Sequence, residues 1–490
     1  MRKNKTKLNL LQILVFATTL SVGYYYFLNK QLKPEPVGIN LIGNTNSSLA
    51  QPSIITLSGI TESKMYFNDD RGIMNAEVTP WALETKKTGG WHTYLTSTYN
   101  TFMCTTPNNI FDLKNEDNLA SRNNCTLRLE PGLKPNKFTS SNSVPLWYRD
   151  YHGTFSAHLI SNANKDIQLY SINHSESYNN DSLAIRFPNQ TTPPCIPVED
   201  MGYGKLPCGS NNWWGSYNAW ITLSRMPWTY NNLTSNKQFE DLGPITWPSN
   251  GYIESLDGNK TWIKATDGGI RHPTSIIKDN YLYVFYEDLS QGKESDGRGP
   301  GIKVIRAPIT NGVVDPNSFK AYFNGNFTEN SLPAGFNLPT YYSSLNQKGP
   351  RASSLFPELT KTAPQPTLGT KRTGARQVGD IVSFSVARVE GTDYYLGVAH
   401  ELSRGVTLRL SRDLTSWSNP VVVPGTAENW WLGKTDLQKY PLLYPRLANK
   451  NGDSNVSINP NEFYIIGTQT KPRNSSEAKV VNQIKLKLSL

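Results

Sequence analysis

Acidic, histidine and arginine side chains recur at the ends of strands that the sequence predicts to pair as β-hairpins. Because the two strands of a hairpin run antiparallel, the start of the first strand and the end of the second lie at the same edge of the sheet. Carboxylates and imidazoles gathered at one such rim can transfer protons, and arginines can bind an anion. The first-strand starts carry Arg149, Asp150, His152, Arg271, His272, Arg376, Tyr444 and Arg446, and the second-strand ends carry His174, Glu176, Glu287, Asp288, His400, Glu401 and Gln469.

Each of these residues also has a plainer interpretation. A single charged residue at a strand end is often solvated, and an arginine there can simply pair with a neighbouring acid. The joint pattern favours a common centre, because four of the six histidines of the chain fall at these ends. Neighbouring residues of a strand point to opposite faces, so only one of Glu287 and Asp288 is expected to face that centre.

The hairpin that is easiest to predict spans residues 271–289. Its sequence, RHPTSIIKDNYLYVFYEDL, has an alternating second half and a tight-turn signal at Lys278-Asp279-Asn280. Similar hairpins are predicted around residues 147–176, 375–401 and 444–469. Every hairpin except the last in the chain, 444–469, is followed by an outer-strand pattern, for example GVTLRLSRDLTSWSNPVVV at 405–423.

Four strands per unit, with four clear units and room for one more on the N-terminal side, predict an all-β, five-bladed β-propeller. A β-sandwich also contains successive hairpins, but it does not explain the four-strand cycle. The propeller is expected to span residues 56–490, with an irregular part at 56–140 and clear repeats from residue 144. We expect the ring to be closed by the terminal segment VNQIKLKLSL or by strands before residue 140.

The N-terminal residues predict export. Four basic residues precede an uncharged stretch from Leu8 to Leu28, which is long enough to span a bilayer. Residues 1–33 are therefore expected to be an uncleaved signal-anchor, with a cleaved signal peptide as the alternative, and 34–55 a stalk. The chain is expected to be extracytoplasmic, attached to the membrane by this single N-terminal helix or secreted if it is cleaved.

The cysteines and the charge agree with export and limit the partners. The four cysteines fall into two local pairs, Cys104 with Cys125 and Cys195 with Cys208, and nearest-neighbour disulfides are one of three possible connectivities. A zinc site is the alternative, but no C-x-x-C motif accompanies them. The net charge is +10 without any block of basic residues, which disfavours nucleic acid as a partner.

Three stretches resemble propeller families that act on glycans. SRDLTSWSNPVVV (411–423) resembles an outer hairpin of glycoside hydrolase families 43 and 32 and their relatives, and SLDGNKTW (255–262) is similar to the Asp box of sialidase-type propellers, with Asn259 in place of a glycine. HPTSIIKDNYLYVFYED (272–288) resembles an inner hairpin of family 43, with His272 where an Asp usually stands. The resemblance covers residues 144–470. Asp257 and Asp413 themselves are expected to form turns rather than to catalyse.

The resemblance implies an exported or membrane-anchored glycoside hydrolase that acts on an oligo- or polysaccharide. Asp150 corresponds to the first-blade aspartate that serves as the catalytic base or nucleophile in these families. The proton donor is expected among Glu176, Glu287 and Glu401, with a pKa raised by burial or by a neighbouring carboxylate. His272 is a further candidate acid, because some relatives of these families use a histidine as the acid. The three-carboxylate set of family 43 is not reproduced.

The remaining residues of the rim are expected to bind the substrate. Arg149, Arg271, Arg376 and Arg446 would repel one another unless they bind an anion such as a uronate, or unless each pairs with a rim acid. The substrate-binding set is completed by His152, His174, His400, Glu401 and Tyr444. No cofactor or metal is expected.

Two other classes of function remain open. A polysaccharide lyase would use an arginine or histidine to neutralise a uronate and would use Tyr151, Tyr286 or Tyr444 as the base. A non-catalytic glycan-binding propeller would use Trp213, Trp214, Trp430 or Trp431 as stacking platforms.

Overall fold

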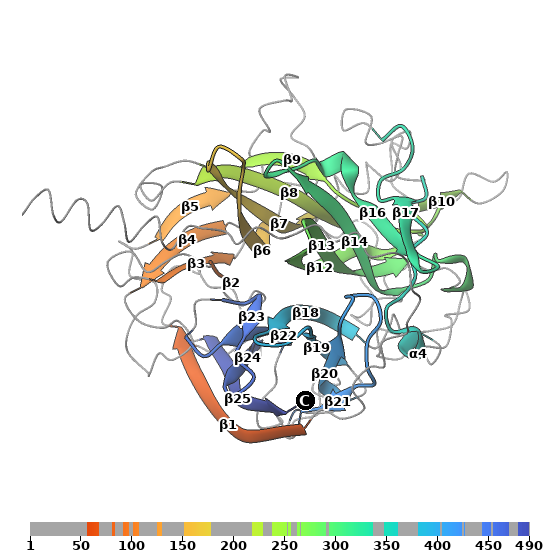
Figure 1. Ribbon diagram of the computed structural model, residues 1–490. Coiled ribbons are helices and arrows are strands. Elements are labelled where there is room, and N and C mark those ends of the chain that lie inside the picture. Colours follow the sequence, from red (N-terminus) through yellow and green to blue (C-terminus); the bar gives the residue numbers. More distant parts are fainter. Residues whose placement is uncertain are drawn as a thin grey trace, which may run out of the picture. The chain divides into compact units, whose positions relative to one another are not determined.

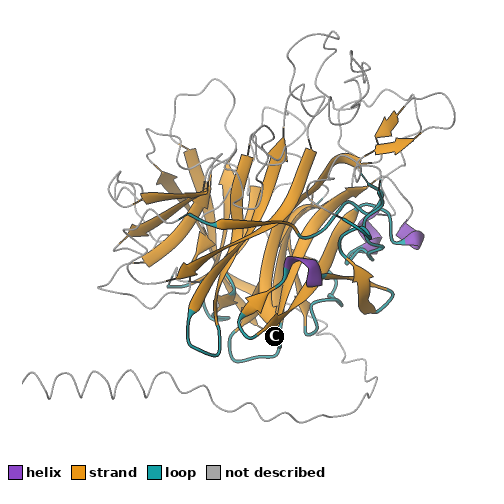
Figure 2. Cartoon of the chain, turned by 90° about the horizontal axis from the view of Figure 1, so that it is seen from above, coloured by secondary structure: helices purple, strands orange, loops and turns teal. Residues whose placement is uncertain are grey.

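Strands make up most of the residues that the structure describes (Figure 2). The structure is a computed structural model, and it describes residues 56–67, 81–83, 92–97, 101–106, 125–129, 151–177, 218–228, 238–251, 253–255, 262–264, 266–290, 294–336, 347–360, 381–401, 404–423, 426, 443–451, 454–469 and 479–489. The helices among them are short: α4 (Pro357–Thr360), η5 (Glu294–Asp296) and η6 (Pro316–Ser318). The fold of the described part is therefore all-β.

Antiparallel runs of strands form the units of the fold, each named here after its first strand (Figure 1). The β2 unit has β2 (Trp81–Ala82), β3 (His92–Ser97), β4 (Thr101–Thr106) and β5 (Cys125–Leu129). The β6 unit has β6 (Tyr151–Ser161), β7 (Ile167–Ser177), β8 (Asn218–Trp228) and β9 (Glu240–Pro244). The β12 unit has β12 (Thr266–Lys278), β13 (Tyr281–Ser290), β14 (Gly301–Thr310), β16 (Lys320–Phe323) and β17 (Asn326–Asn330), with β15 (Val313–Val314) paired to β14.

The later units are built in the same way. The β18 unit has β18 (Ile381–Val389), β19 (Tyr395–Glu401), β20 (Gly405–Ser411) and β21 (Val421–Val422), with β23 (Ser457–Ile458) parallel to β18. The β22 unit has β22 (Leu443–Asn449), β24 (Phe463–Gln469), β25 (Lys479–Ser489) and β1 (Thr56–Phe67). A small hairpin of β10 (Ile253–Ser255) and β11 (Trp262–Lys264) stands apart from these units in strand pairing.

The β22 unit joins the two ends of the described chain. Strand β25 pairs with β24 on one side and with β1 on the other. Both segments that the sequence offered for closure thus belong to one sheet. Residues 56–140, which were expected to be irregular, contain β1 and the β2 unit.

Apolar clusters pack each unit against the next. Ile172 and Leu282 belong to a cluster shared by the β6 and β12 units, and Phe285 and Phe384 to one shared by the β12 and β18 units. A third cluster joins the β18 and β22 units, and a fourth joins the β2 and β6 units. The amide of Ala82 in β2 donates to Asn455, which in turn donates to the carbonyl of Leu447 in β22. The succession of contacts therefore returns to its start, and the fold is propeller-like.

The predicted hairpin of residues 271–289 is confirmed as β12 and β13. Lys278 pairs with Tyr281, and both Asp279 and Asn280 have positive φ, 50° and 60°. Two successive left-handed residues are typical of a type I′ hairpin turn, which asparagine and aspartate tolerate. Asp413 also has its expected turn role, since its Oδ1 accepts hydrogen bonds from the amides of Thr415 (2.8 Å) and Ser416 (2.6 Å).

The predicted cysteine pairs are only partly within the described residues. Cys104 in β4 is disulfide-bonded, and its register partner in β5 is Cys125. Directly opposed residues of antiparallel strands are close enough for a disulfide, so this pairing remains a consistent prediction. Cys195 and Cys208 lie outside the described residues, as do residues 1–55 with the predicted anchor and stalk. In the described part of the chain, no helix is long and apolar enough to cross a membrane.

Candidate active site

Rings from three units meet beside the starts of their first strands. The His272 ring of β12 lies 5.6 Å from the His174 ring of β7 and 4.7 Å from the Tyr444 ring of β22, measured between centroids. Phe155 of β6 lies 5.3 Å from His174 and 6.1 Å from His272. We call Phe155, His174, His272 and Tyr444 the central ring cluster.

Irregularities in the first strands direct these side chains toward one another. The pairing register shifts between Thr154 and Ser156 in β6, between Arg271 and Thr274 in β12, and between Leu443 and Arg446 in β22. A bulge re-aims the side chain that it carries, and such bulges are frequent beside active sites. The bulges thus explain why Phe155, His272 and Tyr444 leave the regular alternation.

Two residues of the central ring cluster have strained backbone conformations. His272 has φ 52° and Tyr444 has φ 49°, and each stands immediately before a proline. Non-glycine residues in the left-handed region cost on the order of 1 to 3 kcal/mol and cluster at functional sites. Two strained residues whose rings touch make this position the strongest candidate for a functional centre.

An ionised carboxylate lies next to the central ring cluster. Arg271 holds Glu287 with two hydrogen bonds, from Nε to Oε2 (2.6 Å) and from Nη2 to Oε1 (3.1 Å). His272 Nδ1 lies 3.1 Å from the same Oε2. Burial by itself would raise the pKa of Glu287, but Arg271 and His272 outweigh it and lower the pKa.

This geometry corrects one expectation and decides another. Glu287 was a candidate proton donor with a raised pKa, but its pKa is lowered, so it stays ionised and is a poor acid. Arg271 was expected either to bind a substrate anion or to pair with a rim acid, and it pairs with Glu287. Of the neighbouring acids Glu287 and Asp288, only Glu287 contacts the central ring cluster, as expected. Asp288 instead accepts hydrogen bonds from Ser249 and Ser290.

The second carboxylate of the cluster is Glu176. Its Oε1 is hydrogen-bonded to His174 Nε2 at 2.5 Å, and both side chains are almost fully buried. The two residues are separated by one position on β7, so they share the face of the strand that turns toward β12. The site therefore holds two imidazole–carboxylate pairs whose imidazoles are stacked at an interplanar angle of 27°.

His152 lies on the other face of the β6 unit. It precedes the bulge of β6 and is paired with Ser175, and its Nε2 is hydrogen-bonded to Thr222 Oγ1 at 3.2 Å. Thr222 belongs to a buried polar network with Asn173 and Ser175. Strand alternation turns His152 away from the central ring cluster, and its expected role in substrate binding stays a prediction.

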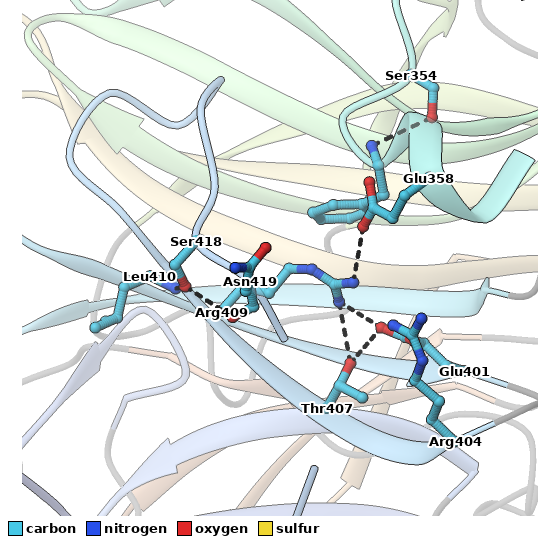
Figure 3. A network of polar contacts seen from close by, with 10 residues as sticks. Ser354, Glu358, Glu401, Arg404, Thr407, Arg409, Leu410, Ser418 and Asn419 are labelled. Carbon is cyan, nitrogen blue, oxygen red and sulfur yellow. Dashed lines mark hydrogen bonds and ion pairs between the residues drawn. The ribbon is translucent and has the colours of Figure 1, made fainter. Parts of the chain in front are cut away.

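Glu401 is likewise turned away from the site. It is fully buried, its Oε1 is paired with Arg409 and accepts from Thr407 Oγ1 (2.6 Å), and Arg404 contacts its Oε2 (Figure 3). Arg409 also binds Glu358 of α4 at 3.1 Å. The expected role of Glu401 in substrate binding is corrected, since this ion-pair network already occupies its carboxylate. The neighbouring His400 is buried on the opposite face of β19, opposite Val406 of β20.

Arg446 links the central ring cluster to one further aromatic residue, Trp81. The Arg446 guanidinium lies 5.4 Å from the ring centroids of both Trp81 and Phe155. Strand-end position in the sequence marks Arg446 and Tyr444 as candidate site residues, but it does not mark Trp81 or Phe155. Phe155 occupies an ordinary position in an alternating strand, so only the bulge of β6 brings it to the site. Arg149, Asp150 and Arg376 lie outside the described residues, and their roles remain predictions.

The buried histidines predict that acid destabilises the fold. Burial lowers the pKa of His152 from 6.5 to about 3, and those of His158, His272 and His400 to about 4. The unfolded chain binds protons first as the pH falls below 6.5, so stability decreases from there toward the folded pKa. Each such histidine costs about 2 kcal/mol of unfolding free energy at about pH 5.

Denaturant titrations of wild type and His152→Gln at about pH 7 and pH 5 measure this dependence. We expect the variant to lose less unfolding free energy on acidification, since it lacks one buried imidazole. Equal losses in the two proteins would contradict the assignment of a strongly lowered pKa to His152.

Comparison with solved structures returns enzymes that act on glycosidic bonds. The chain is structurally similar to glycoside hydrolases. A family 62 α-L-arabinofuranosidase of Coprinopsis cinerea has 10% sequence identity and a TM-score of 0.36, with 85% of this chain and 93% of that chain covered. An α-L-arabinofuranosidase of Podospora anserina, solved with cellotriose, has 11% identity and a TM-score of 0.37, with 85% and 92% covered.

A family 117 glycoside hydrolase of Zobellia galactanivorans has 8% identity and a TM-score of 0.35, with 88% of this chain and 91% of that chain covered. No protein-family model matches the chain, and no curated protein matches its sequence. TM-scores this low carry no residue equivalences, so the assignment of roles depends on the contacts described above.

Proposed function

We propose that this chain is an exported or membrane-anchored glycoside hydrolase with a five-bladed propeller, acting on an oligo- or polysaccharide. The observation that carries the proposal is the convergence of two buried imidazole–carboxylate pairs, His174–Glu176 and His272–Glu287, at strained strand ends. Glycosidic hydrolysis needs one group that protonates the leaving oxygen and one that activates water or attacks carbon. The aromatic rings around these pairs suit the apolar faces of sugars.

Glu176 is the proposed proton donor. It is buried and hydrogen-bonded to His174, whereas the two-point contact with Arg271 keeps Glu287 ionised. Asp150 immediately precedes β6, and its neighbour Tyr151 pairs directly with Glu176 across the two strands. This register supports the proposal that Asp150 lies near Glu176, where it serves as base or nucleophile.

The charge of the site and the enzymes that the chain resembles narrow the choice of substrate. Arg271, which adjoins the central ring cluster, is neutralised by Glu287, which favours a neutral sugar over a uronate at this position. The similar structures include arabinofuranosidases, an arabinanase and a xylosidase. We therefore propose pentose-containing polysaccharides as the first substrates to test.

Product analysis tests the proposal. The full chain is incubated with arabinan, arabinoxylan, xylan and a panel of aryl glycosides, and reducing ends and released phenol are measured. Hydrolysis of at least one substrate is expected, and Asp150→Asn should abolish it while the thermal unfolding temperature stays unchanged. Absorbance of an unsaturated uronate on acidic polysaccharides would establish a lyase instead, and tight binding without any product would establish a binding protein.

A further inference from the structure

Asparagine followed by glycine is the pair at which an asparagine side chain loses its amide most readily. The backbone nitrogen of the following residue attacks the side-chain carbonyl carbon, and glycine has no side chain that hinders this attack. The chain contains four such pairs: Asn250-Gly251, Asn311-Gly312, Asn324-Gly325 and Asn451-Gly452. Since the following residue is the same at all four, the fold decides which of them reacts.

Hydrogen bonds hold the first of these pairs. The Gly251 amide donates to the carbonyl oxygen of Pro248 at 2.9 Å, and the Asn250 amide donates to Ser290 Oγ at 3.1 Å. Gly251 is also buried, so its nitrogen can attack only after a buried hydrogen bond has been broken. Gly452 lies outside the described residues.

The second and third pairs form the same kind of turn in the β12 unit (Figure 1). Asn311-Gly312 joins β14 to β15 with φ of 52° and 75°, and Asn324-Gly325 joins β16 to β17 with φ of 49° and 86°. Two successive left-handed residues are typical of a type I′ hairpin turn. Local backbone conformation therefore does not distinguish the two pairs.

Packing around the glycine does distinguish them. Asn311 is exposed, but Gly312 is buried, and a Cβ added to it would lie 2.4 Å from the Cα of Asn162. The backbone of this turn cannot rotate without displacing the turn between β6 and β7. Asn324 and Gly325 are both exposed, and a Cβ added to Gly325 would have no atom within 4 Å. Because ring closure requires the backbone to leave its hairpin conformation, the open turn is the one that can react.

We propose that Asn324 is a site of spontaneous deamidation, which converts the turn between β16 and β17 into an aspartate or isoaspartate turn. The Gly325 nitrogen bonds to Cγ of Asn324 and gives its proton to water, and the side-chain amide leaves as ammonia. Water then opens the cyclic imide, and the Gly325 nitrogen regains a proton. Opening at the side-chain carbonyl gives aspartate, and opening at the backbone carbonyl gives isoaspartate. The net reaction consumes one water and releases one ammonia, so it requires no oxidant and no cofactor.

The isoaspartate product affects the outer strands of the β12 unit. It inserts a methylene into the backbone of a two-residue turn, so the register in which Phe323 pairs with Asn326 can no longer be kept. Strand β17 is the last strand of the described sheet, and its Phe327 ring lies 4.1 Å from the Arg306 guanidinium. We therefore expect deamidation to loosen β17 and to lower the thermal unfolding temperature.

Peptide mapping by mass spectrometry tests the proposal on the full chain, kept folded in neutral and in mildly alkaline buffer. All four Asn-Gly peptides are followed in the same digest by the gain in mass from an amide to an acid. The Asn324 peptide should convert at least about tenfold faster than the Asn250 and Asn311 peptides, because only the packed turns must first be opened. In the chain unfolded in urea, the rates should become similar. Equal rates for Asn311 and Asn324 in the folded protein would overturn the proposal, as would an unreacted Asn324 peptide under conditions in which the unfolded chain reacts.

A variant links the modification to its effect on stability. Asn324→Gly accepts the left-handed conformation and has no amide to lose, and Asn311→Gly is the matched control. After ageing, the wild type and Asn311→Gly should unfold at a lower temperature than before, whereas Asn324→Gly should be unchanged. The same loss in aged Asn324→Gly would overturn the effect assigned to β17. Neither measurement uses a substrate, so both outcomes are independent of the proposed hydrolase function.

Discussion

Glu176→Gln is expected to lower kcat on the order of 10² to 10⁴-fold, which is the usual contribution of a general acid. Glutamine has nearly the same shape as glutamate, so it keeps a hydrogen bond to His174, but it cannot give a proton to a leaving oxygen. The loss should be smallest for substrates whose leaving group is an activated phenol, because such a group departs without protonation. Steady-state kinetics on two aryl glycosides with phenols of different acidity measure both effects.

Glu462→Gln is the matched control for this substitution. Glu462 is partly exposed and pairs with Lys485, away from the central ring cluster, so its replacement should leave kcat unchanged. Circular dichroism and thermal unfolding of Glu176→Gln should match the wild type. An equal loss of kcat on good and poor leaving groups would show that Glu176 does not protonate the leaving oxygen.

The largest effect on stability is expected from Arg409→Met. Arg409 and Glu401 are both almost fully buried and face each other (Figure 3). The Arg409 guanidinium also lies 4.4 Å from the centre of the Phe356 ring. The substitution leaves the Glu401 carboxylate buried, with Thr407 and the half-exposed Arg404 beside it. Removing one partner of a buried ion pair costs about 3 to 5 kcal/mol of unfolding free energy.

Arg404→Gln is the control within the same network. Arg404 contacts the same carboxylate, but 40% of its side chain is exposed to solvent. Exposed ion pairs contribute about 1 kcal/mol or less, so urea titration should show only a small loss. If both variants unfold at the same denaturant concentration, the buried pair is not the main contributor. A raised KM in Glu401→Gln, measured well below its unfolding temperature, would return Glu401 to the substrate-binding residues.

The regular part of the fold could be predicted because it depends on local patterns. Alternating apolar residues and the Asp279-Asn280 turn specify the hairpin of β12 and β13 within a few residues, and the Asp413 turn is equally local. The sequence offered two segments that could close the ring, the C-terminal segment and strands before residue 140. Both contribute a strand to the β22 unit, β25 and β1. The weak patterns at residues 56–140 left room for one more unit, but the strands of the β2 unit could not be located, since they have only two to six residues each.

The candidate site was predicted as a rim but not as a set of contacts. Strand-end position correctly brought His174, Glu176, Arg271, His272, Glu287 and Tyr444 together. It failed for His152 and Glu401 because strand alternation sends neighbouring residues to opposite faces, and the bulges change which residue faces the centre. A one-residue register shift cannot be located from hydrophobic alternation alone.

Local patterns in the amino-acid sequence were enough to predict the all-β hairpins, the polar residues at their ends and the unusual Arg271-His272 pair where a family 43 enzyme would show an aspartate. The contacts of that pair became known only from the folded chain. Arg271 neutralises Glu287, and Glu287 is hydrogen-bonded to His272, so the charges of Arg271 and Glu287 balance each other. The physical reason is that the protonation and charge of a buried group depend on its neighbours within a few ångströms, and those neighbours come from strands far apart in the chain.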